Sequence, residues 1–292
     1  MKETKKLAIG YAILSALLYS IYTPAAKILG IKFPPAYLTA YLYLGSGIGL
    51  GILYGLFNNW FNQNESNVDQ TDIFDLGIMI VFNIGAGILL NWGIRLSSAM
   101  SMSLVGNFEI VATTIIAICW GEKVSKKLWF GILIIFMASI FLTFNLQDLK
   151  ISLGILLGLI ATILWGFENN FTKKLSVKNP IQVVIIKGLG VGIGSYLVAI
   201  LSKETYINNV ESIIWCFVIG FFAFGLSILL YVFSQRYIGA AKTSAYYAIS
   251  PFISVLLSFV ILHEKLTMQF GAAFILMIVR ISVVVSDTLH KE

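Results

Sequence analysis

Ten apolar runs of membrane-spanning length divide this sequence, with short polar stretches between them. A helix that crosses the hydrocarbon core of a bilayer needs about twenty mainly apolar residues. The runs are Leu7–Ala26, Ala36–Phe57, Ile73–Ile94, Ser98–Trp120, Leu128–Phe144, Ile151–Phe171, Ile181–Leu201, Ser212–Phe233, Ala241–Leu262 and Phe270–Val285. The sequence therefore predicts an all-α polytopic membrane protein with ten transmembrane helices.

The composition argues against soluble classes of protein. Hydrophobic residues make up 58% of the chain and charged residues 12%, whereas a soluble domain has roughly 25% charged residues. The net charge of +6 comes mainly from Lys and Arg at run boundaries, where orientation signals lie, so we expect no nucleic-acid partner. The two cysteines lie inside apolar runs and the two histidines at run ends. We therefore expect neither a disulfide framework nor a metal site or other cofactor.

Positive charges between the runs predict the orientation of the chain. With the N-terminus inside, twelve Lys and Arg residues fall in inner segments and six in outer segments. We therefore expect a multi-pass protein of the cytoplasmic membrane with both termini in the cytoplasm. The first run follows Lys2, Lys5 and Lys6, as in a signal peptide, but it is long and precedes nine more runs. We interpret it as a retained first helix.

Two stretches of the sequence share one design, which predicts an internal repeat. Ser98–Glu122 and Ala241–Glu264 each begin with small residues, continue as an apolar run and end in Glu-Lys. Aligned on their terminal glutamates, the two stretches place Glu109 opposite Pro251. One copy therefore has a charge where the other has a helix-bending residue.

Two glycine-rich segments, Gly45–Gly51 and Gly188–Gly194, pair in the same way. Because they lie inside membrane spans, we interpret them as helix-packing positions and not as a phosphate-binding loop. Five spans per copy is an odd number, so the second copy is expected to cross the membrane upside down. We therefore expect two inverted five-helix repeats, residues 1–147 and 148–292, with a substrate site near the midplane between them.

Four charged residues lie within the runs and away from their first turns, where a charge costs about 3 kcal/mol or more. They are Glu109, Glu168, Lys187 and Arg280. One interpretation is internal ion pairing, such as Glu168 with Lys187 or Arg280. The span of Glu109 offers no basic partner within a turn or two. We therefore expect Glu109 to contact the substrate, and either Glu109 or Glu168 to carry a coupling proton.

Aromatic residues are expected to surround this carboxylate. The candidates are Tyr19, Tyr22, Tyr43, Trp92, Trp165, Tyr246 and Tyr247. A carboxylate with several ring faces, and without paired acidic and basic groups, suits a lone organic cation. A desolvated cation over an aromatic face gains about 2 kcal/mol, and a carboxylate at about 5 Å adds roughly 3 kcal/mol at an effective dielectric constant near 20.

The sequence resembles the drug/metabolite transporter superfamily, in particular its ten-helix branch with EamA-type halves. The resemblance covers the whole chain and rests on the small-residue starts of the fourth and ninth runs and on Trp165-Gly166, Pro251, Glu122-Lys123 and Glu264-Lys265. In length, in Glu109 and in the aromatic residues the chain is also similar to bacterial choline importers of the LicB type. That likeness implies choline uptake coupled to protons, to supply phosphocholine decoration of the cell surface. We expect transport by alternating access, and uniport stays open as the alternative to proton symport.

Other functions remain open at this level. An exporter of amino acids or other small metabolites would use Lys187 or Arg280 to hold a carboxylate. An intramembrane enzyme is disfavoured, because the sequence has no His-Glu-x-x-His motif, no Gly-x-Ser-x-Gly motif and no histidine in mid-span. A scaffold or receptor would not require mid-membrane charges on several helices.

Overall fold

The computed structural model describes residues 2–57, 66–119, 130, 134, 137, 144–145, 150–175, 177–206, 208–238, 243, 246–247, 249–265, 268, 270–272, 274–276 and 278. Within these residues the chain is almost entirely helical. The elements are α1 (Lys2–Ser20), α2 (Tyr22–Lys32), α3 (Pro35–Leu56), η1 (Gln70–Asp72), α5 (Ile73–Leu96), α6 (Ala99–Val105), α7 (Phe108–Cys119), β1 (Phe144–Asn145), β2 (Lys150–Ile151), α9 (Leu153–Leu175), α10 (Pro180–Leu201), α11 (Val210–Gly220), η2 (Phe221–Leu226), α12 (Ser227–Ile238) and α14 (Ser250–Leu262).

Six helical segments are long and apolar enough to cross a membrane. They are Lys6–Lys32, Pro35–Leu56, Gln70–Leu96, Leu153–Thr172, Pro180–Leu201 and Val210–Ile238. They match the first, second, third, sixth, seventh and eighth runs, while the fourth and ninth contain the shorter helices α6, α7 and α14. The fifth and tenth runs lie largely outside the described residues. An all-helical chain with several membrane spans is thus confirmed, and ten spans in two inverted repeats stay a prediction.

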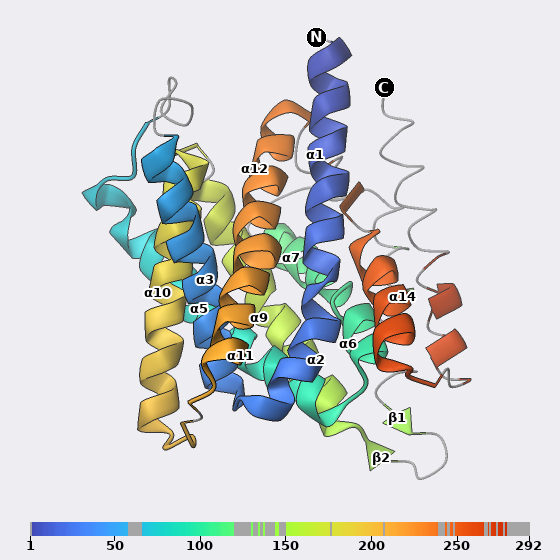
Figure 1. The fold of residues 1–292 in the computed structure, drawn as a ribbon. Helices are drawn as coiled ribbons and strands as arrows, with labels where there is room; N and C mark the ends of the chain where they lie inside the picture. Colours follow the sequence, from blue (N-terminus) through green and yellow to red (C-terminus); the bar gives the residue numbers. More distant parts are fainter. Residues whose placement is uncertain are drawn as a thin grey trace.

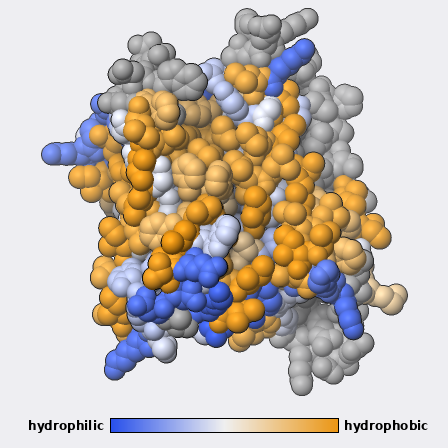
Figure 2. Space-filling model, in the orientation of Figure 1, coloured by the Kyte–Doolittle hydropathy of each residue, from blue (hydrophilic) through white to orange (hydrophobic). Residues whose placement is uncertain are grey.

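The helices form two groups with α7 and α9 between them in the view of Figure 1. The helices α3, α5 and α10 pack side by side on one side of the molecule, and α1, α12 and α14 pack on the other. The short helices α2 and α6 and the β1–β2 hairpin lie at the end opposite the N-terminus. Figure 2 shows hydrophobic residues over most of this face and hydrophilic residues near its lower rim, as expected for a protein surrounded by lipid.

The first span is longer than predicted and bends in its middle. The helix α1 ends at Ser20, and α2 begins at Tyr22 and continues to Lys32. Pro24, in the first turn of α2, has no N–H to donate to the carbonyl of Ser20, and its ring prevents a straight helix at this position. The bend therefore falls beside Tyr19 and Tyr22.

Glycines allow α3 to approach its neighbours closely. A Cβ atom at Gly47 would lie 2.6 Å from the backbone nitrogen of Leu189 in α10, and one at Gly188 would lie 2.6 Å from the nitrogen of Gly47. A Cβ atom at Gly220 of α11 would lie 1.8 Å from the carbonyl oxygen of Leu42. The interpretation of the glycine-rich segments as helix-packing positions is confirmed where α3 crosses α10.

Candidate functional site

Three tyrosines from different helices meet at Phe224. This residue lies in η2, a π-helical segment between α11 and α12, and such segments often occur at functional sites. The centroid of its ring is 4.7 Å from that of Tyr43, 4.8 Å from that of Tyr22 and 5.9 Å from that of Tyr19. Sequence analysis missed Phe224, because nothing in an apolar run distinguishes it from the phenylalanines on either side.

Further ring contacts connect Tyr19 to residues in the C-terminal part of the chain. The ring centroid of Tyr19 lies 5.9 Å from that of Tyr22 and 5.9 Å from that of Tyr247. Tyr247 in turn contacts Tyr231 of α12 at 5.0 Å. We call these six residues the aromatic cluster: Tyr19, Tyr22, Tyr43, Phe224, Tyr231 and Tyr247.

Two buried asparagines of α5 hold rings at this site. The Oδ1 atom of Asn83 accepts hydrogen bonds from the hydroxyl of Tyr43 at 2.6 Å and from Nε1 of Trp165 at 3.1 Å. The Oδ1 atom of Asn91 accepts from the hydroxyl of Tyr22 at 2.9 Å. Asn83 and Asn91 are eight residues apart and so lie on one face of α5, about two turns from each other. Trp165 of α9 is thereby tied to the aromatic cluster.

The fourth run, predicted as one continuous helix, is broken in its middle. The helix α6 ends at Val105 and α7 begins at Phe108. At the break the backbone N–H of Asn107 bonds to the carbonyl of Leu104, and that of Glu109 bonds to the carbonyl of Gly106. These are three-residue spacings in place of the four-residue spacing of an α-helix. Broken helices at membrane depth are a common feature of transporter binding sites.

Glu109 lies in the first turn of α7, directly after this break. Its Oε1 atom accepts a hydrogen bond of 2.7 Å from Nδ2 of Asn169 in α9. Its carboxylate is close enough to Tyr19, Tyr43 and Tyr247 of the aromatic cluster to interact electrostatically with their hydroxyl groups. Among the described residues, no Lys or Arg forms an ion pair with Glu109.

Glu168, the other candidate for a coupling carboxylate, is already paired. Its Oε1 atom lies 3.0 Å from Nζ of Lys187, and the two side chains are 2% and 8% exposed. The hydroxyl of Thr172 also donates to this carboxylate. The internal ion pair considered from the sequence is therefore confirmed, with Lys187 as the partner. Arg280, the other partner considered, lies outside the described residues.

The structure does not bring two of the expected aromatic residues into the aromatic cluster. Trp92 is 38% exposed near the end of α5, and the guanidinium of Arg95 lies 5.8 Å from its ring centroid. Tyr246 is half-buried, and within the described part of the chain no ring contact joins it to the cluster. It precedes Tyr247 by one residue, so helical geometry turns the two side chains about 100° apart.

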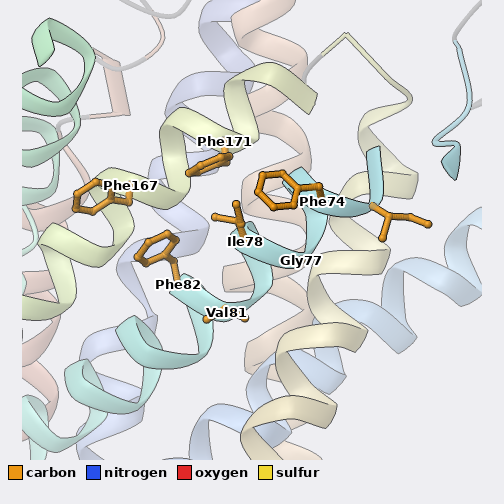
Figure 3. A pocket seen from close by; sticks show the side chains of 8 residues that line it. Phe74, Gly77, Ile78, Val81, Phe82, Phe167 and Phe171 are labelled. Atoms are coloured by element: carbon orange, nitrogen blue, oxygen red, sulfur yellow. The ribbon is translucent and has the colours of Figure 1, made fainter. Parts of the chain in front are cut away.

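A separate apolar groove of about 740 Å³ lies between α5 and α9. Its lining residues include Phe74, Val81, Phe82 and Phe167, and Figure 3 shows the ring of Phe82 facing that of Phe167. Phe74 is 74% exposed and Val81 is 67% exposed, so the groove opens on the outer surface of the helices. None of its lining residues is polar or charged, and we therefore take Glu109 and the aromatic cluster, and not this groove, as the candidate site.

A helical membrane fold with charged and polar groups at mid-span, beside a broken helix, is typical of membrane transporters. The chain belongs to the EamA-like transporter family, whose family model matches residues 6–144 and 152–286. This membership accords with the expectation that the chain is a transporter and not an enzyme.

One relative is a transporter, and one solved structure shares the fold. The uncharacterized transporter YyaM of Bacillus subtilis (strain 168) is 24% identical over 259 residues, which cover 83% of this chain and 83% of that protein. One solved crystal structure, of a protein 18% identical in sequence, superposes with a TM-score of 0.69 over 94% of both chains. This second likeness concerns the fold alone.

Proposed function

We propose that this protein imports choline, or a closely related quaternary ammonium cation, across the cytoplasmic membrane by alternating access. One observation carries the proposal: Glu109, a mid-span carboxylate that forms no ion pair with a described residue, lies within electrostatic range of Tyr19 and Tyr247 of the aromatic cluster. A quaternary ammonium group has no N–H to donate, so it is recognised by negative charge and by ring faces. The site offers both.

The rings that would contact the cation come from distant parts of the chain. Tyr19 and Tyr22 flank the bend of the first span, Phe224 lies in η2, and Tyr247 precedes α14. A cation seated among these rings would therefore join segments from both predicted repeats. In an alternating-access cycle such contacts change when one repeat moves against the other.

The charge of the substrate supplies a driving force for import. With the cell interior negative, moving one positive charge inward gains about 2.3 kcal/mol per 100 mV, or roughly fiftyfold accumulation. Uniport is therefore sufficient for uptake. If proton symport adds to it, Glu109 is the better carrier, because protonating Glu168 would leave Lys187 as an unpaired buried charge.

The ion pair also weakens the alternative of amino-acid export. An exporter would need a cationic group to hold the carboxylate of its substrate, and Lys187 is occupied by Glu168 at 3.0 Å. Arg280 lies outside the described residues.

The proposal is tested by calorimetric titration of the purified protein with choline, with an aromatic amino acid as competitor. We expect saturable choline binding that the amino acid does not disturb, and loss of binding in Glu109→Gln. This variant keeps an oxygen for Asn169 and removes the charge. Glu211→Gln is the matched control, because Glu211 is an exposed carboxylate in the first turn of α11. Unchanged choline affinity in a folded Glu109→Gln protein would contradict the proposed site.

A second measurement tests the direction and the coupling. Proteoliposomes with an imposed, inside-negative potassium diffusion potential should accumulate radiolabelled choline. An additional inward proton gradient should increase the accumulation only if protons are cotransported. Accumulation of an aromatic amino acid in place of choline would favour the alternative function.

A further inference from the structure

The side chain of Asn83 contains a hydrogen-bond donor for which the described part of the chain provides no acceptor. Asn83 is 0% exposed, and its Nδ2 atom is buried without a hydrogen-bond partner among the described residues. The orientation of the amide is fixed by Trp165, because an indole nitrogen can only donate. The atom 3.1 Å from Nε1 of Trp165 must therefore be Oδ1 of Asn83, which leaves the NH₂ group on the other side.

Asn91, on the same face of α5, provides an internal comparison. Its Oδ1 atom accepts from Tyr22 at 2.9 Å, and its Nδ2 atom donates to Oγ1 of Thr39 at 2.9 Å. Both ends of this amide are therefore used within the protein. Asn83 and Asn91 have the same role as acceptors for a tyrosine hydroxyl, and they differ in that the donor of Asn83 is free.

A free buried donor is costly, because it has lost water without gaining a partner. Asn83 is also hydrogen-bonded directly to a member of the aromatic cluster. It bonds to Tyr43, whose ring stacks on that of Phe224 with centroids 4.7 Å apart. A ligand seated on these rings would lie within a side chain's length of the amide.

We propose that Asn83 is a specificity-determining residue, and that its Nδ2 atom donates a hydrogen bond to an oxygen atom of the substrate. The substrate class is then a hydroxyalkyl ammonium cation: the ammonium lies against the rings and Glu109, and the hydroxyl oxygen lies at Asn83. This inference rests on the proposed function and deepens it, because rings and a carboxylate alone would not distinguish choline from a simple tetraalkylammonium ion.

The test compares the affinities of choline and of propyltrimethylammonium, which replaces the hydroxyl by a methyl group. We expect the wild-type protein to prefer choline by about tenfold, because a site with a donor for a substrate oxygen disfavours a ligand that lacks this oxygen. In Asn83→Asp an oxygen still accepts from Tyr43 and Trp165, but the NH₂ donor is lost. Its added charge attracts all these cations alike, but its second oxygen can accept a hydrogen bond from the choline hydroxyl. In this variant the donor is therefore isolated by comparing 2-methoxyethyl-trimethylammonium, whose ether oxygen can only accept, with butyltrimethylammonium, which lacks that oxygen. We expect the ratio of these two affinities to fall to about one in Asn83→Asp.

Asn91→Asp is the matched control. It makes the same chemical change on the same face of α5, but the lost donor bonds to Thr39 within the protein. The preference for the ether should therefore persist in this variant. A preference for the ether that persists in Asn83→Asp, or that is lost equally in both variants, would overturn the inference.

A measurement on the wild-type protein keeps the inference testable if a variant folds poorly. The ion 2-methoxyethyl-trimethylammonium has an ether oxygen that can only accept, and butyltrimethylammonium has nearly the same shape without it. Tighter binding of the ether indicates a donor on the protein, as proposed, and equal binding of the two ions overturns the role of Asn83. If the wild-type protein binds none of these cations, the proposed function itself fails, and the inference fails with it.

Discussion

Lys187 and Glu168 form an ion pair of 3.0 Å in the interior of the helix bundle, where the two side chains are 8% and 2% exposed. The next residue of α9, Asn169, donates a hydrogen bond to Glu109 on α7. Two consecutive residues of α9 thus interact with α10 and with α7. One of the two mid-span carboxylates is paired with a lysine within the fold, and the other forms no ion pair with any described residue.

The first prediction concerns this pair. Lys187→Met is expected to destabilise the protein by about 3–5 kcal/mol, because it leaves Glu168 as an uncompensated buried charge. The double variant Glu168→Gln with Lys187→Met should recover most of this loss, since neither charge then remains. Thermal unfolding in detergent measures both effects. Choline binding should persist in the double variant, and its loss in a stably folded protein would show that the pair belongs to the substrate site.

The second prediction concerns Phe224, whose ring contacts three tyrosines. Phe224→Leu keeps an apolar side chain but removes the ring face, so the affinity for choline should fall on the order of tenfold. Phe222→Leu is the control, because Phe222 lies in the same π-helical segment but is 41% exposed. Titration of both variants provides the comparison. Equal affinities in the two variants would place the cation away from Phe224.

Much of this architecture could be predicted from the sequence, because it follows from residue type alone. Apolar length identifies a membrane span, glycine spacing identifies a close crossing, and a lone carboxylate in mid-span identifies Glu109 as a candidate. The resemblance to the family rested on short motifs such as Trp165-Gly166 and Glu122-Lys123. These properties are local and do not depend on which helices are neighbours.

The remaining details of the site depend on helix rotation, which the sequence does not encode locally. Phe224 and Phe222 lie in the same apolar run, and the π-helical register determines which of them is buried. Asn83 and Asn91 were not identified, because a neutral amide in a span becomes informative only when its partners on α2, α3 and α9 are known. Trp92 was expected near the substrate, but its position near the end of α5 exposes it beside Arg95.

The third prediction concerns the ion pairs of Lys178 with Asp69 and Asp72, which join the turn before α10 to the segment before α5 and which we call the clasp. The ammonium of Lys178 lies 2.7 Å from Asp69 and 2.9 Å from Asp72. Hydrogen bonds from Lys178 and Thr71 hold the pKa of Asp69 below its usual value, and the two carboxylates raise the pKa of Lys178. Asp69 and Lys178, the two groups whose pKa is shifted, lie outside the membrane spans, and Asp72 lies in the first turn of the span Gln70–Leu96.

The signs of these two pKa shifts define a pH window for the clasp. The contribution of Asp69 is present above its unfolded pKa of about 3.9 and is lost as the pH falls through its lower folded pKa. The contribution of Lys178 is present below about 10.4 and is lost as the pH rises through its higher folded pKa. Lys178→Gln should therefore lower the melting temperature slightly at pH 7, and the difference from wild type should vanish in strong acid. A difference that grows as the pH falls would contradict this assignment.

The fourth prediction concerns helix packing. Gly220→Ala is expected to destabilise the protein by more than about 2 kcal/mol, because the new Cβ atom would overlap the carbonyl of Leu42 and force α3 and α11 apart. Gly51→Ala is the control, since a Cβ atom at Gly51 meets nothing within 4 Å. This second change should leave the thermal stability unchanged or raise it slightly. Equal melting temperatures for the two variants would rule out a close crossing at Gly220.

The last prediction concerns Asn107, at the break between α6 and α7. Asn107 is 2% exposed, and both polar atoms of its side chain are without hydrogen-bond partners among the described residues. Asn170 on α9 is also a buried amide, but its donor has partners. Its Nδ2 atom donates to the carbonyls of Gly166 at 2.8 Å and Thr113 at 3.2 Å. An amide kept unpaired at a helix break reduces stability, and such features are expected where function requires them.

Asn107→Leu should therefore leave the stability unchanged or raise it by about 1 kcal/mol, because it removes an unsatisfied polar group. Asn170→Leu should lower the stability by about 1–3 kcal/mol, because it removes a donor from carbonyls that then remain buried. We further expect Asn107→Leu to slow choline uptake into proteoliposomes, since the amide would find its partners in another step of the transport cycle. Thermal unfolding and uptake, measured on both variants, separate the two effects. A folded Asn107→Leu protein with wild-type uptake would reduce Asn107 to a structural residue of the break.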